Sequence, residues 1–98
     1  MTTFEKVLEV FADYLLEDAD CEVIRTRHGY TLLIWDNTAQ EWETCEHCQT
    51  PETLRDRLAD AYDDFAELKI TGGERELTGE ERKQISAERH RLIKLCSE

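Results

Sequence analysis

The sequence predicts an α+β domain in which helices pack on a three-stranded antiparallel sheet, in the order α-β-β-β-α-α. Three observations predict this class. Apolar residues recur at helical spacing near the start of the chain, two strand-like segments flank a glycine-containing turn, and capping sequences open two further apolar-periodic segments. Because 98 residues bury enough surface for one modest core, we expect a single domain over residues 1–98.

The first helix is expected over residues 3–18. Its apolar residues lie three or four positions apart, and Thr2 and Glu5 have the spacing of a capping box. The apolar positions are Phe4, Val7, Leu8, Phe11 and Leu15. A ridge of carboxylates follows at four-residue steps, formed by Glu5, Glu9, Asp13 and Glu17. Like charges at this spacing destabilise a helix, so the ridge requires compensation or has a use.

The three strands are expected at residues 21–27, 30–36 and 41–46. Since glycine adopts a positive φ freely, we expect His28 and Gly29 to form the two-residue turn of a β-hairpin. A turn at this point sets Val23 opposite Ile34. The third strand carries glutamates that discourage edge-to-edge pairing, which favours a place at an edge of the sheet.

The middle strand is apolar on both faces. Two helices cover one face of a three-stranded sheet. The other face then requires either the last helix, crossing over within the chain, or a second chain. Burial within the chain is the simpler expectation, because monomers rarely expose large apolar patches.

A second helix is expected at residues 51–69. Thr50, Pro51 and Glu52 provide, in order, a cap, a first-turn proline and an acid that suits the helix dipole. Apolar residues gather on one face of this helix, at Leu54, Leu58, Ala61, Tyr62 and Phe65.

The last helix is expected at residues 79–96, after a break at Gly72-Gly73. Thr78 and Glu81 have the spacing of a capping box. Its apolar stripe is thin and consists of Ile85, Leu92, Ile93, Leu95 and Cys96. A stripe this narrow packs at the margin of a core or against another chain.

Negative charge is concentrated in the first part of the chain. Residues 1–70 hold 17 Asp and Glu against 6 Lys and Arg, whereas residues 71–98 hold 6 of each, so the net charge of −11 belongs to the first part. Such a surface repels nucleic acid and anionic lipid and attracts basic proteins. We therefore expect a basic protein partner, no direct nucleic-acid binding and no membrane association.

The sequence also predicts the cellular compartment of the protein. No run of 18 apolar residues occurs, and the first residues lack the basic region of a secretory signal. We expect a cytoplasmic protein, in which the four cysteines stay reduced rather than form a disulfide framework.

Cys45 and Cys48 form the one metal-like motif, a CxxC pair. A structural zinc site needs four ligands, and His90 and Cys96 complete a set only if the last helix folds back to the third strand. A small zinc- or thiol-dependent module is therefore one alternative. The simpler interpretation is cysteines that pack as small apolar residues or stay free.

Signatures of catalysis are missing from the sequence. There is no Gly-x-Ser-x-Gly elbow and no phosphate-binding glycine loop, and Asp18-Ala19-Asp20 lacks the further ligands of a calcium loop. We expect a non-enzymatic protein without a cofactor.

The acidic ridges are the leading candidate for a binding surface. The helix at 51–69 repeats the four-residue pattern of the first helix. The residues predicted to contact the partner are Glu9, Asp13, Glu17, Asp56, Asp60, Asp63 and Asp64. Rows of carboxylates spaced about 6 Å along each helix axis imitate a DNA phosphate backbone coarsely, so a DNA mimic is one form of this hypothesis. An ordinary solvated acidic face is the simpler interpretation, and a structural homodimer through the spare sheet face or the last helix is a further alternative.

Four short stretches resemble small uncharacterised acidic proteins carried by bacterial integrative and conjugative elements, a group with no assigned activity. The stretches are Trp35-Asp36, Glu46-His47-Cys48, Thr50-Pro51-Glu52-Thr53-Leu54-Arg55 and Ile70-Thr71-Gly72-Gly73. The resemblance spans most of the chain and implies an accessory role on a mobile element, where proteins that neutralise host defences are often acidic. It implies no functional residues.

Overall fold

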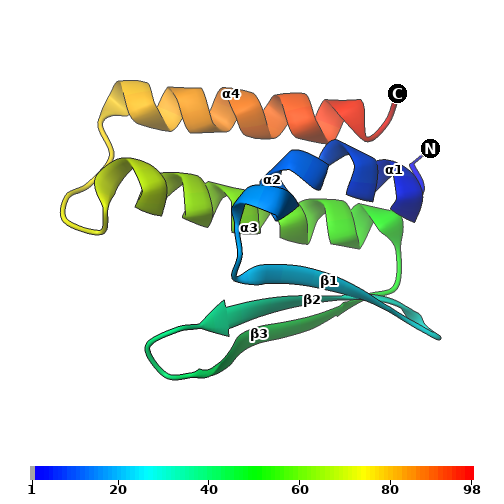
Figure 1. Ribbon diagram of the computed structural model, residues 1–98. Helices are drawn as coiled ribbons and strands as arrows, with labels where there is room; N and C mark the ends of the chain where they lie inside the picture. The colour runs from blue at the N-terminus through cyan, green and yellow to red at the C-terminus, as the bar shows by residue number, and fades with distance from the viewer. Residues whose placement is uncertain (1) are drawn as a thin grey trace.

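A computed structural model describes residues 2–98 and confirms the α+β class (Figure 1). The elements are α1 (Phe4–Val10), α2 (Ala12–Glu17), β1 (Cys21–Thr26), β2 (Gly29–Asp36), β3 (Glu41–Cys48), α3 (Pro51–Thr71) and α4 (Gly79–Leu95). The sheet is antiparallel with the order β1-β2-β3, so β3 lies at an edge as expected. Figure 1 shows α3 between the sheet and α4, which makes α3 the centre of the packing.

The expected single helix at residues 3–18 is interrupted at Phe11. This residue has φ −93° and ψ 9°, yet hydrogen bonds from Phe11 N to the Val7 carbonyl and from Leu15 N to the Phe11 carbonyl carry the chain through. The cap is Thr3, whose Oγ1 accepts from the Lys6 amide at 3.1 Å, so the expected capping box at Thr2 is wrong. Apolar spacing fits both halves equally well, which is why the pattern does not reveal the interruption.

The turn of the hairpin lies one residue earlier than expected, at Arg27-His28, and the predicted pairing of Val23 with Ile34 is wrong. Val23 pairs with Leu32, and Thr26 pairs with Gly29. The Thr26 hydroxyl fixes this turn, because it accepts from the His28 amide at 3.2 Å and donates to the Gly29 carbonyl at 3.3 Å. The shift moves each partner by two positions, so the residues that share a face are unchanged.

Gly29 is required by close packing and not by the turn alone. It begins β2 with φ 126°, and a Cβ placed there would come within 2.6 Å of the Cys48 carbonyl oxygen on β3. Only glycine combines this backbone conformation with this approach.

The core lies between the inner face of the sheet and the helices. Leu32 contributes the centre of the sheet, and Tyr30 and Ile34 pack beside it on β2. From the helices, fully buried side chains come from Val7, Phe11, Leu54, Leu58 and Ala59.

The two later helices begin as expected. The Thr50 hydroxyl accepts from the Thr53 amide with Pro51 in the first turn, and Thr78 and Glu81 form both hydrogen bonds of a capping box. Gly72, with φ 65°, ends α3 in the left-handed conformation. None of the helices in the described part of the chain is long and apolar enough to cross a membrane.

The simpler expectation for the second sheet face is wrong, because α4 does not cross over. Its buried residues Ile85, Leu92 and Cys96 pack on the helical side, and Figure 1 shows α4 separated from the sheet by α3. The narrow apolar stripe of α4 matches a helix at the margin of the core. The outer face of the sheet is left without a cover from within residues 2–98.

Candidate functional site

The first carboxylate ridge is divided by the interruption at Phe11. Glu9 belongs to α1, whereas Asp13 and Glu17 belong to α2. Glu17 forms an ion pair with Lys69 on α3. Glu9 and Asp13 are exposed and have no ion pair with any residue from 2 to 98.

The second ridge is largely neutralised within the fold. Asp60 and Asp63 both bind Arg89 of α4, with Nη1 to oxygen distances of 2.9 and 2.6 Å. Asp56 pairs with its neighbour Arg55 at 2.9 Å. These carboxylates tie α4 to α3 or compensate local charge, and Asp64 is the ridge residue on α3 that has no such partner among the described residues.

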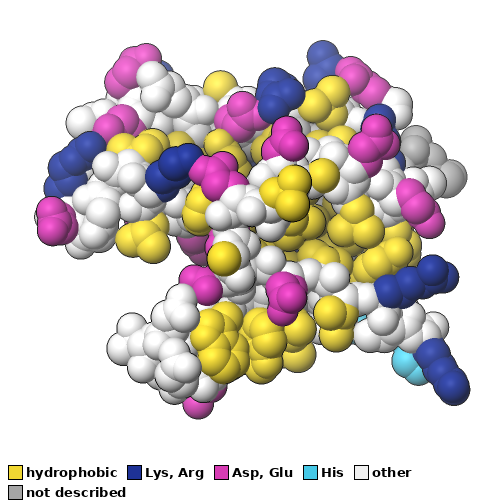
Figure 2. Space-filling view, in the orientation of Figure 1, with side chains coloured by type: hydrophobic (Ala, Val, Ile, Leu, Met, Phe, Trp, Pro, Cys, Tyr) yellow, Lys and Arg dark blue, Asp and Glu magenta, His cyan; other side chains and the backbone are white. Residues whose placement is uncertain are grey.

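A cavity of about 380 Å³ opens between the helical layer and the end of the sheet near Asp36, and we call it the notch. Figure 2 shows this hollow in the outline of the molecule, above the left end of the sheet. The notch is lined by residues of α2, the α2–β1 loop, β2, β3 and α3: Tyr14, Asp18, Ala19, Asp20, Ile34, Trp35, Glu43, Ala61, Asp64, Phe65 and Leu68. Four of these are carboxylates, and no lysine or arginine is among them.

Two of the notch carboxylates are held in place by hydrogen bonds. Asp18 accepts from the Tyr14 hydroxyl at 2.7 Å and from the Asp20 amide at 3.1 Å. Both carboxylate oxygens of Asp20 accept from Nδ2 of Asn37 at 3.0 Å. Neutral donors orient these groups and leave their negative charge without a counterion. The pKa of Tyr14 is raised, first by burial and then by its bond to Asp18, so the tyrosine stays a neutral donor.

The other two carboxylates stand on the opposite walls. Glu43 lies in β3 beside the irregularity where the pairing shifts between Ile34 and Trp35, and Asp64 lies on the exposed side of α3. Neither forms an ion pair within residues 2–98. The notch is therefore negative on all of its sides.

Apolar side chains form the walls between these charges. The rings of Tyr14 and Phe65 meet edge to face with centroids 5.6 Å apart. Leu68, on the same helix as Phe65, is 61% exposed. Apolar walls with a negative rim suit a cation on a hydrocarbon stem, as in lysine or arginine.

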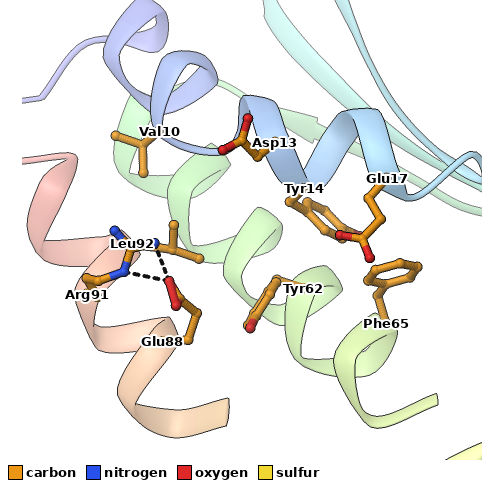
Figure 3. Close-up of a pocket in the computed structure, with 9 residues that line it drawn as sticks. All are labelled: Val10, Asp13, Tyr14, Glu17, Tyr62, Phe65, Glu88, Arg91 and Leu92. Carbon is orange, nitrogen blue, oxygen red and sulfur yellow. Dashed lines mark hydrogen bonds and ion pairs between the residues drawn. The ribbon is translucent and has the colours of Figure 1, made fainter. Parts of the chain in front are cut away.

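A smaller cavity of about 190 Å³ lies between α2, α3 and α4 (Figure 3). It contains Asp13, Glu17 and Glu88 and shares Tyr14 and Phe65 with the notch. Its charges are mostly compensated, because Arg91 donates to Glu88 at 2.7 Å on the same helix, as Figure 3 shows, and Glu17 pairs with Lys69. This cavity is the weaker of the two for a cation.

The cysteine motif is divided between the two faces of the sheet. Cys48 is fully buried on the inner face, whereas Cys45, three positions earlier, is exposed on the outer face. Burial raises the pKa of the thiols of Cys48 and Cys96, and His90 is exposed and bonded to the Ser86 carbonyl. No group of three metal-ligating side chains forms within residues 2–98, so the candidates Cys45, Cys48, His90 and Cys96 are not brought together.

Of the residues predicted to contact a partner, Asp64 lines the notch. The spacing of Asp18 and Asp20 indicates only an incomplete calcium loop, and the position of Glu43 in an edge strand indicates only protection against edge-to-edge pairing. The notch forms where the sheet and α3 diverge, and a loop, a strand and a helix from distant parts of the chain line it. The sequence alone does not reveal this arrangement.

No protein-family model, curated protein or solved structure matches this chain.

Proposed function

We propose that this protein is a non-enzymatic binding protein that captures a basic segment of a partner protein in the notch. The observation that carries the proposal is the ring formed by Asp18, Asp20, Glu43 and Asp64, which surrounds an apolar cavity and includes no basic residue. The partner supplies the missing positive charge, and the protein is expected to act by occupying that partner.

The partner side chain is expected to enter as an extended cation. Its hydrocarbon stem contacts Phe65 and Leu68, and its charged head reaches the carboxylates of the rim. Arginine can form paired hydrogen bonds with a carboxylate, which favours an arginine-rich segment over a lysine-rich one.

The remaining acidic surface supports the encounter. Glu9 and Asp13 are exposed and free of ion pairs in the described residues, and the net charge of −11 attracts a basic protein from a distance. Asp56, Asp60 and Asp63 contribute to this field but are already paired, so we assign them to steering and to stability rather than to the contact itself.

The resemblance to proteins of mobile elements supports a particular kind of partner. A basic nucleic-acid-binding protein of the bacterial host would present exposed arginines and lysines, and its capture would serve an accessory role on such an element. In this form of the proposal the protein imitates the charge of DNA only locally, at the notch.

The proposal is tested by titrating a synthetic arginine-rich peptide with interspersed leucines into the protein and following tryptophan fluorescence, because Trp35 lines the notch. We expect the double variant Glu43→Gln and Asp64→Asn to weaken binding by about 10-fold or more. The matched control removes two charges away from the notch, by Glu76→Gln and Glu98→Gln, and should change affinity by less than about 2-fold.

Equal losses for the two double variants would mean that only net charge matters, and would contradict a site at the notch. An affinity that does not fall with rising salt would contradict ionic recognition altogether. Lysate of a bacterial host passed over the immobilised protein should yield a basic protein released by moderate salt, and added duplex DNA should compete for that protein.

A further inference from the structure

The strand β3 forms an open edge of the sheet. It has 8 residues and, within residues 2–98, pairs only with β2 (Figure 1). Cys45 and His47, in its second half, are exposed. An open edge presents unpaired N–H and C=O groups, and an extended segment of another protein can add to them as a further strand.

The unpaired groups in the second half of β3 belong to Cys45 and His47. The Trp35 amide donates to the Asp20 carbonyl at 2.8 Å, so Trp35 directs its backbone groups toward β1. Successive residues of an antiparallel strand direct these groups to opposite sides, so Ile34 and every second residue before it on β2 face β3. Their partners on β3 are Thr44, Glu46 and Cys48. The residues between these partners therefore direct their N–H and C=O groups away from β2, to the open edge.

The charge of this edge favours a basic strand. β3 carries Glu41, Glu43 and Glu46 and contains no lysine or arginine. Glu46 pairs with Arg57 of α3, whereas the other two glutamates form no ion pair within residues 2–98. Pairing with the same strand of a second copy would bring glutamates together. The edge therefore disfavours the protein itself and favours a segment rich in arginine and lysine.

The other edge of the sheet has a different charge. Both edges reach the notch, because Asp20 directly precedes β1 and Glu43 belongs to β3. However, β1 carries one acid and one base, Glu22 and Arg25, and the exposed Arg27 follows it in the turn. A basic strand would meet like charge on this edge, so charge distinguishes β3 from β1.

We propose that the basic segment of the partner continues from the notch along β3 and adds to the sheet as a fourth strand. This inference rests on the proposed function, because it concerns the same segment. The backbone of the segment forms hydrogen bonds with Cys45 and His47, and its basic side chains at the notch end lie near Glu41 and Glu43. From Glu43 to Cys48 the strand spans about 16 Å, at about 3.3 Å per residue, so about six residues of the partner complete the pairing.

Amide hydrogen exchange tests the added strand directly. Saturating arginine-rich peptide should slow the exchange of the Cys45 and His47 amides by about 10-fold or more, because these amides become donors to the peptide. The matched control is the open edge of β1, where the amides of Val23 and Arg25 point outward by the same alternation. Their exchange should change by less than about 2-fold. Unchanged exchange at Cys45 and His47, or equal slowing at both edges, would overturn the proposal.

Peptides with methylated backbone nitrogens separate strand addition from binding at the notch. Two versions of the arginine-rich peptide have identical side chains and carry N-methyl groups at either the odd or the even positions. Only one of the two sets of amides can face β3, so one version should bind about 10-fold or more weakly than the other.

The outcomes of this comparison distinguish the two proposals. If the two methylated peptides bind equally, while the unmodified peptide binds and is weakened by Glu43→Gln with Asp64→Asn, strand addition is overturned and the notch remains the site. If the unmodified peptide does not bind, the proposed function is overturned together with strand addition.

Discussion

The two ends of the space between sheet and helices differ sharply. At the end near the hairpin tip, Tyr30 packs against Phe4 with ring centroids 4.7 Å apart, and Cys48 and Leu54 are fully buried. At the other end the notch separates the layers, Leu68 is exposed, and the four notch carboxylates form no ion pair within residues 2–98. We call these the closed end and the open end. Stability is therefore concentrated at the closed end. The open end can keep a charged surface that does not contribute to folding.

The largest expected effect is on the core of the closed end. Leu54→Ala removes a fully buried leucine and should lower the free energy of unfolding by about 3 kcal/mol. Leu68→Ala, the same change at the open end, should cost less than about 0.5 kcal/mol. Urea denaturation of both variants checks the contrast, and similar losses would mean that the two ends do not differ.

Gly29 should give the next largest effect. Gly29→Ala combines a positive φ with a Cβ only 2.6 Å from the Cys48 carbonyl oxygen, and we expect a loss of about 2 kcal/mol or more. Gly72→Ala is the control, because its φ is also positive but no atom lies within 4 Å of the added Cβ. It should cost about 1 kcal/mol. A cost for Gly29→Ala no greater than for Gly72→Ala would show that the close approach to β3 is unimportant.

Two neighbouring carboxylates on α3, Asp63 and Asp64, should differ in their contribution to stability, because only Asp63 forms an ion pair in the described residues. Asp63→Asn weakens the contact with Arg89 and should destabilise the protein by about 1 kcal/mol. Asp64→Asn at the notch removes like-charge repulsion and should leave stability unchanged or raise it by up to about 0.5 kcal/mol. Thermal unfolding at low salt measures both. If Asp64→Asn proved the more destabilising of the two, the assignment of these acids would have to be reversed.

Alkaline pH should destabilise the fold through Cys21, a buried core residue at the start of β1. Burial, the largest cause, raises the pKa of Cys21 to about 11 from its usual value near 9.0. Because the pKa of Cys21 is higher in the folded protein than in the unfolded chain, the protonated thiol contributes to stability. This contribution is fully present below pH 9 and is lost as pH rises through about 11. The unfolding temperature should therefore decrease as pH is raised from 9 to about 11, and it should decrease less steeply in the Cys21→Ala variant. A parallel decline in both proteins would remove Cys21 as a cause.

Much of the fold could be predicted because its signals are local. The caps at Thr50 and Thr78, the apolar face of α3 and the apolar run in β2 each depend on neighbouring residues. The interruption at Phe11 and the place of the turn could not be predicted, since apolar spacing fits both helical halves and the turn is fixed by a single hydroxyl, that of Thr26.

The candidate site was harder to predict because it depends on which carboxylates find partners. The four-residue spacing correctly identified acidic rows, but Arg89, far along the chain, neutralises Asp60 and Asp63. The unpaired acids lie on segments separated by tens of residues and meet only where the sheet diverges from α3. No sequence pattern reports such a divergence without knowledge of the packing.

The most direct test of the central claim is a titration of isotopically labelled protein with the arginine-rich peptide, followed by amide chemical shifts. We predict that the largest shifts cluster at residues 18–20, 43, 64 and 68, around the notch, and that they shrink as salt is added. Shifts spread evenly over the acidic surface, or centred on α4, would contradict the notch as the binding site.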